Sequence, residues 1–436
     1  MSAPEPSKRT PLSLRVIGPG LLVAATGIGA SDIAVTAYSG SQYGLMLLWA
    51  VAIGAIVKFI LNENLARWQL GTGRTILEGA VTHLGILAWI AFGVYLLPWT
   101  FLVGGALLNA CGVTAHALAP FTSDPVIGNR VYGAAAGLIA CTLVLLGGYK
   151  AFARVMGVCI VLMFLVVILG VAMRPPNLAE FASGLFLPRT PRGLDGALWT
   201  VALIGSVGGT LTVICYAYWM QEAGIAGREK VKEARLDLAI GYIVTGIFGF
   251  AMMTLAQGIE LTDPDKASTL ITGLADRLQS RFENDATREL IPPAAFRYIF
   301  LLGAFGAMFS SILGVWQSVP YVFADWWRLR ARAGKPDLPP AERIQTGTPL
   351  YRGYLIWITL ISLVGVFLPF KGILKWYAVV GALFFPGLAL AVLLLNGRRR
   401  FGMPDGLRNP PIWSVILALI LAAMVVVGVA EVLKEF

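Results

Sequence analysis

Long apolar runs separated by short polar connections dominate the chain. A run of about 18 or more apolar residues is long enough to cross a bilayer as a helix, and about eleven such runs are present. They cover residues 16–41, 45–66, 85–109, 131–148, 153–173, 197–222, 237–258, 295–324, 352–369, 374–396 and 412–432. This pattern predicts an all-α integral membrane protein that forms a single domain over residues 1–436.

Composition and charge agree with a membrane protein. Hydrophobic residues make up 57% of the chain and charged residues 13%, against roughly 25% charged residues in a soluble domain. These values exclude an ordinary soluble enzyme and a disordered chain. Basic residues gather in alternate connections, such as 228–235, 328–343 and 398–408, which predicts a cytoplasmic N-terminus in the cell membrane. The net charge of +10 is thereby explained without nucleic acid as a partner.

Two of the predicted spans contain helix-breaking segments. The first span holds Thr26-Gly27-Ile28-Gly29-Ala30-Ser31-Asp32, and the sixth holds Gly205-Ser206-Val207-Gly208-Gly209-Thr210-Leu211-Thr212. Clustered glycines disfavour a helix, although small residues also serve close helix packing in membranes. Asp32 favours the first explanation, because an ionisable residue at membrane depth indicates a functional site.

The spacing of the two interrupted spans suggests an internal repeat. They lie five positions apart in the order of spans, which is typical of two inverted five-span repeats. We expect these repeats over about 16–173 and 197–396, followed by an extra helix over about 412–432.

The start of the chain resembles a known family. The segments Gly18-Pro19-Gly20-Leu21-Leu22-Val23-Ala24, Gly40-Ser41-Gln42-Tyr43-Gly44 and Leu47-Leu48-Trp49 are similar to the first part of the Nramp family of divalent-metal transporters. The similarity continues through Ala66-Arg67 and Thr72-Gly73-Arg74. It implies the LeuT-type fold, with inverted five-span repeats and interrupted helices 1 and 6. It also implies transport of manganese, iron and related ions, usually with protons.

The family motifs that bind the metal are altered in this chain. Where the family has Asp-Pro-Gly-Asn in the first span, this chain has Gly29-Ala30-Ser31-Asp32. One carboxylate is lost and another is gained. The Met-Pro-His motif of the sixth span aligns with Val213-Ile214-Cys215, or with Thr212 at the methionine position after a slip of one residue. Without the thioether, hydroxyls, carbonyls and one carboxylate remain, and these suit harder ions such as magnesium or manganese. Cys215 is a further candidate that would supply sulfur, although a buried cysteine more often serves packing.

The resemblance therefore implies a shifted, oxygen-rich metal site. We expect Asp32 to bind the ion directly. The other candidates are carbonyls near Thr26, Gly29 and Gly209, the hydroxyls of Ser31, Thr210 and Thr212, and Val213 at the methionine position. The ion is the transported substrate, and no cofactor is expected.

The residues that serve proton coupling in the family are replaced in this chain, which argues against coupling. The family's acidic pair in the third span aligns with Pro98 and Phe101, and its sixth-span histidine aligns with Cys215. A new charge stands in the second span, where Lys58 lies midway in an apolar run. A lysine at this depth must pair, snorkel or lose its proton. Asp32 or Glu63 could pair with it, and its role is either structural or one of gating and charge compensation.

Two other classes of function remain open. The fold could carry a small organic solute, because glycine-rich breaks also expose amides that bind a carboxylate. A membrane binding protein that transports nothing is the second alternative. An enzyme is disfavoured, because no nucleophile–base pair, metal cluster or phosphate loop is recognisable. We expect a monomer that contacts the lipid bilayer and its cation.

Overall fold

The protein is helical throughout the part of the chain that is described. The computed structural model describes residues 18–173, 175–259, 267–283, 292–368, 370–398 and 401–433. Its first half contains α1 (Pro19–Gly27), α2 (Ala30–Tyr43), α3 (Leu48–Thr72), α4 (Ile76–Leu84), α5 (Ile86–Leu118), α6 (Pro125–Met173) and α7 (Leu178–Phe186). Its second half contains α8 (Leu194–Ser206), η1 (Leu211–Cys215), α9 (Tyr216–Glu222), η2 (Arg228–Lys230), α10 (Val231–Ala256), α11 (Ala267–Glu283), α12 (Pro293–Leu329), η4 (Arg330–Arg332), α13 (Pro349–Gly365), α14 (Phe370–Gly397), η6 (Asp405–Leu407) and α15 (Pro411–Leu433).

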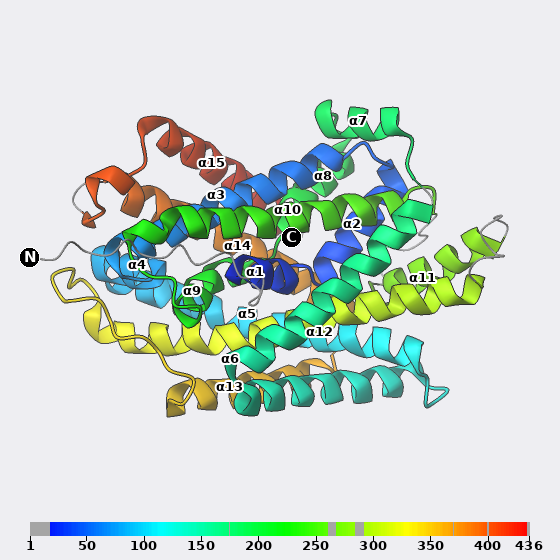
Figure 1. Cartoon of the computed structure of the whole chain (residues 1–436), viewed down its shortest axis with the longest axis horizontal. Helices are drawn as coiled ribbons and strands as arrows, with labels where there is room; N and C mark the ends of the chain where they lie inside the picture. The colour runs from blue at the N-terminus through cyan, green and yellow to red at the C-terminus, as the bar shows by residue number, and fades with distance from the viewer. Residues whose placement is uncertain are drawn as a thin grey trace, which may run out of the picture.

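Each predicted span coincides with a helix or with an interrupted pair of helices. The predicted fourth and fifth spans are the two halves of α6, which turn sharply at Gly148, where φ is 61°. The halves run in different directions in Figure 1. Among the described residues, six helices are long and apolar enough to cross a membrane, or seven if the bent pair α1 and α2 counts as one span. The predicted all-α membrane fold is confirmed.

The outward faces of the helices are apolar. Val94 of α5 is 70% exposed, and Leu146 of α6 is 83% exposed. Large apolar side chains are exposed along most of the other long helices as well. A surface of this kind is unfavourable in water and suits contact with lipid.

The first interrupted span lies at the centre of the bundle. α1 is almost entirely buried and packs against α10, α12, η1 and α9 (Figure 1). The second interrupted span, formed by α8, η1 and α9, passes next to it. Both predicted interruptions are therefore present, and they meet inside the protein.

Within the described ranges, three short α-helices lie in the connections. α11 lies in the connection between α10 and α12. α4 follows α3, and α7 follows α6. Neither of these two was predicted, because a helix of nine residues is too short to register as an apolar span.

Candidate functional site

The two interrupted spans cross at their glycines. α1 ends at Gly27, and α8 ends shortly before Gly208 and Gly209, whose φ angles are 84° and 80°. A Cβ atom on Gly27 would lie only 2.6 Å from the carbonyl carbon of Gly208. Only glycine allows this approach and readily adopts these backbone angles. The glycine clusters therefore bring two breaks together that are far apart in the sequence.

Asp32 links the two breaks. It lies in the first turn of α2 and is 3% exposed. One carboxylate oxygen accepts the N–H of Gly208 at 3.1 Å, and the other accepts the N–H of Gly29 at 3.4 Å. The carboxylate is thus the acceptor for N–H groups that the broken helices leave without partners.

Lys58 reaches the same segment from the second span. Its side chain is fully buried in α3, and its Nζ donates to carbonyl oxygens of the 205–209 segment. The possible pairing of Lys58 with Glu63 is not observed. The Glu63 carboxylate pairs with Arg67 at 3.1 Å and with Arg235 at 2.7 Å. Arg67 lies one helical turn from Glu63, which favours their contact.

A small cavity lies where the breaks meet. Its volume is about 10 Å³, close to the least that holds one water molecule. Metal–oxygen distances of about 2.0–2.6 Å are shorter than hydrogen bonds of about 2.7 Å or more, so the space also suits a dehydrated ion. Its wall is mostly apolar and includes Val103, Ala106, Leu107 and Val315, together with Thr26, Gly29, Gly209, Thr212, Ser311 and Tyr377.

The hydroxyls of the cavity wall leave oxygen lone pairs available. Thr26 donates its proton to the carbonyl of Leu22 at 2.7 Å, and Ser311 donates to the carbonyl of Ile28 at 3.1 Å. The hydroxyl of Thr212 is buried and makes no hydrogen bond. A hydroxyl oxygen accepts through two lone pairs. This wall can therefore offer several oxygens to a cation.

The structure brings together part of the predicted ligand set. Thr26, Gly29, Gly209 and Thr212 line one cavity although they come from opposite halves of the chain. Asp32 contacts Gly29 but is not among the lining residues.

The other predicted ligands are placed differently. The Thr210 hydroxyl accepts from Trp99 at 3.0 Å, and Val213 is buried in η1. The side chain of Ser31 lies outside the described residues. Sequence reasoning missed Ser311 in α12 and Tyr377 in α14. The adjacent serines 310 and 311 inside an apolar helix were an available signal.

The candidate ligand atoms at the crossing of the two breaks are oxygens. In the described part of the chain, no three His, Cys, Asp or Glu side chains form a group that could hold a metal. At the crossing these oxygens belong to hydroxyls, to backbone carbonyls and to the Asp32 carboxylate next to Gly29. Such ligands favour magnesium-like and manganese-like ions over soft metals.

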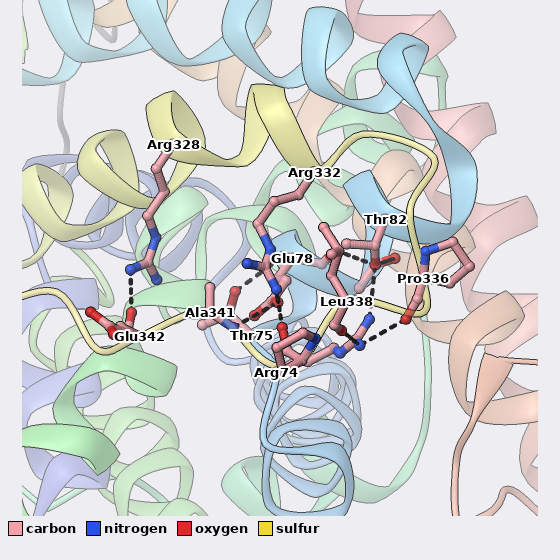
Figure 2. A network of polar contacts seen from close by, with 12 residues as sticks. Arg74, Thr75, Glu78, Thr82, Arg328, Arg332, Pro336, Leu338, Ala341 and Glu342 are labelled. Carbon is pink, nitrogen blue, oxygen red and sulfur yellow. Dashed lines mark hydrogen bonds and ion pairs between the residues drawn. The ribbon is translucent and has the colours of Figure 1, made fainter.

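A network of polar contacts fastens the connection between α12 and α13 to α4 and its neighbouring residues. Figure 2 shows Arg74 donating to the carbonyls of Pro336 and Leu338. The Glu78 carboxylate of α4 accepts the N–H of Ala341 at 2.9 Å and lies 3.4 Å from Arg332. The predicted topology places this connection on the cytoplasmic side.

The same region holds the end of the sixth span. Tyr218 of α9 donates to the Asp325 carboxylate of α12 at 2.8 Å. Glu222 accepts from Tyr321 at 2.5 Å and pairs with Arg343 at 3.1 Å. α9 is therefore joined to α12 and to the connection that follows it, and a movement of α9 relative to them must break these contacts.

Glu78 is expected to make stability depend on pH. Its burial raises the pKa of its carboxyl, against the opposing effect of the Ala341 N–H. The folded protein then holds this proton to higher pH than the unfolded chain, so this group lowers stability as pH rises above 4.5. Glu78→Gln should remove this contribution. Melting curves across pH would detect it, with Glu342→Gln as control because that side chain is exposed. Equal pH dependence in both variants would contradict the assignment.

Comparison with known proteins gives related sequences over much of the chain. The divalent metal cation transporter MntH of Pectobacterium carotovorum is 24% identical over 278 residues, which are 60% of this chain and 64% of the relative. MntH of Bacillus subtilis is 23% identical over 261 residues, which are 56% of this chain and 58% of the relative. The chain thus spans less than two thirds of the length of these curated relatives.

The fold and the family model extend the match to almost the full length. The crystal structure of the Eremococcus coleocola manganese transporter, in complex with an aromatic bis-isothiourea substituted compound, has a TM-score of 0.77 at 14% identity. The alignment covers 98% of this chain and 88% of that one. The family model for natural resistance-associated macrophage protein-like sequences matches residues 20–434. The predicted resemblance is confirmed, and the chain belongs to the Nramp family.

Proposed function

We propose that this protein moves a divalent metal cation across the membrane by alternating access and is not an enzyme. The observation that carries the proposal is the small cavity at the crossing of the two interrupted spans, whose wall includes the hydroxyl-bearing Thr26, Thr212 and Ser311. Its hard donor set favours magnesium or manganese over softer ions. The names of the MntH relatives and of the manganese transporter of similar fold support the same class of substrate.

Asp32 supplies the charge of the proposed site. Its carboxylate contacts Gly29, which lines the cavity, so a change of side-chain rotamer would bring it to the ion. On binding the ion, the Asp32 carboxylate would give up its hydrogen bond from the Gly208 N–H and would ligate the metal instead. Ion binding would thereby loosen the link between the two breaks, and this couples occupancy to movement of the half-helices.

Calorimetric titration and vesicle uptake with manganese and magnesium test the proposal. Saturable binding of either ion, together with uptake, is the expected result. The competing proposal of an organic substrate has less support, because the related sequences and the solved structure of similar fold are named as metal transporters. Intact protein that binds neither ion would favour that alternative. Binding without uptake would favour a membrane binding protein.

Thr212→Val is expected to weaken manganese binding about tenfold, or about 1.4 kcal/mol, without loss of stability. The variant keeps the size of the side chain and removes one oxygen ligand. Because the Thr212 hydroxyl has no hydrogen-bond partner, no internal bond is lost.

Calorimetry and melting curves check both parts of this prediction. Thr245→Val is the matched control, since Thr245 is buried in α10 and donates to Gly241. Equal manganese affinity of the Thr212 variant and the wild type would exclude this hydroxyl as a ligand.

The remaining assignments follow the predicted topology. We propose that the chain is a monomer in the cell membrane with its N-terminus in the cytoplasm. The repeats over about 16–173 and 197–396, with the extra helix over about 412–432, form one transporter domain. Because the residues aligned with the family's proton route are apolar or uncharged, proton coupling is not part of the proposal.

A further inference from the structure

The ammonium group of Lys58 lies in a cage of carbonyl oxygens. Its Nζ donates to the carbonyls of Gly205 at 2.9 Å, Val207 at 3.2 Å and Gly209 at 2.9 Å. The centroid of the Phe385 ring lies 3.8 Å from the same nitrogen. A lysine ammonium has three N–H donors, so each donor has its own carbonyl and the aromatic face covers another side.

The break in the sixth span creates this cage. α8 ends at Ser206, and the last carbonyls of a helix have no partner within it. The positive φ angles of Gly208 and Gly209 continue the chain in a non-helical path. As a result, the carbonyls of alternate residues from 205 to 209 converge on one point. The negative end of the α8 dipole adds to their attraction for a cation.

A cationic donor at this point is favourable for both groups. Converging carbonyls without a partner are unfavourable inside a protein, and a buried ammonium is unfavourable unless its donors are satisfied. Here each group satisfies the other. The same segment is also held by an anion, since the Gly208 N–H donates to Asp32. The Lys58 ammonium and the Asp32 carboxylate therefore both hydrogen-bond to the backbone of residues 205–209.

We propose that this cage is a monovalent-cation site that the protein fills with its own side chain. Unwound carbonyls and half-helix C-termini bind sodium in other transporters with interrupted helices. Lys58 would occupy such a site permanently. Because a tethered ammonium cannot leave, the cage releases no ion to either side of the membrane during transport. Lys58 is thus a built-in counter-charge to Asp32, and this assignment does not depend on the identity of the transported substrate.

Lys58→Ala tests the proposal by vacating the cage. We expect the melting temperature of the purified protein to fall by roughly 5–10 °C. Adding n-propylammonium, which carries the same ammonium on a shorter chain, should restore it in a saturable manner. Sodium chloride is the second probe for the vacated cage. Tetramethylammonium has no N–H donor and should have no effect, and the wild type should respond to none of these cations beyond general salt effects.

Lys58→Met is the matched control, because its apolar chain fills the space without the charge. This variant should melt below the wild type and should not respond to n-propylammonium. The proposal is overturned if the Met variant melts like the wild type. It is also overturned if neither n-propylammonium nor sodium stabilises the Ala variant. Melting temperature is measured without divalent metal, so these outcomes are independent of whether the protein transports a divalent cation.

Discussion

Asp32→Asn is expected to lower manganese uptake at least about 100-fold while the protein stays folded and inserted. Asparagine keeps the shape of the side chain and an oxygen that can accept the N–H of Gly208, now 3.1 Å from Asp32. It removes the negative charge of the proposed site. Two unit charges 4 Å apart at an effective dielectric constant of about 20 attract by about 4 kcal/mol, and about 1.4 kcal/mol corresponds to a tenfold change in affinity.

Uptake into vesicles and calorimetry of the purified variant would measure this loss. Asp276→Asn provides the matched control, since it removes a carboxylate that is 59% exposed and pairs with Arg297 away from the breaks. We expect the control to transport like the wild type. Normal uptake by the Asp32 variant would show that its charge is dispensable and that the residue serves only to hold the two breaks together.

The spans and their interruptions could be predicted because their signals are local. A bilayer requires helices of a minimum length, and each such run left a visible apolar segment. The glycine clusters also marked both breaks. Thr26 and Gly29 on one break, and Gly209 and Thr212 on the other, line one cavity because the glycines permit the two backbones to cross.

The remaining features depend on contacts between distant segments. Ser311 and Tyr377 line the cavity, but in the sequence a single serine or tyrosine in an apolar helix looks like ordinary packing. The orientation of Asp32 depends on an N–H that the other break supplies.

From the sequence, Lys58 could pair with Asp32 or Glu63, snorkel or lose its proton. Its actual acceptors are backbone carbonyls, which every residue carries and which no sequence pattern distinguishes. Arg67 and Arg235 also compete for Glu63, the carboxylate that we had considered as a partner. A buried charge in the sequence therefore predicts that a partner exists, but not which group it is.

Gly27→Ala is expected to disrupt the site through the backbone. The added Cβ would meet the carbonyl carbon of Gly208 at 2.6 Å and its oxygen at 2.8 Å. The two breaks would have to separate by roughly 1 Å to restore an ordinary contact distance. Metal sites tolerate about 0.2 Å in their ligand distances, so Gly209 and Thr212 would no longer share an ion with the first break. Overpacking costs about 1–3 kcal/mol, and here that cost would act at the crossing that positions the ligands. We therefore expect uptake to fall at least about tenfold.

Gly205→Ala separates this effect from a general cost of replacing glycine. A Cβ atom at Gly205 meets nothing within 4 Å, and the residue lies inside α8, where alanine favours the helix by about 1 kcal/mol. This variant should transport normally and melt at the same or a higher temperature. If both alanine variants transported equally well, the close crossing at Gly27 would not be required for function. If only Gly27→Ala failed, the approach of the two backbones would be established as the feature that positions the cation.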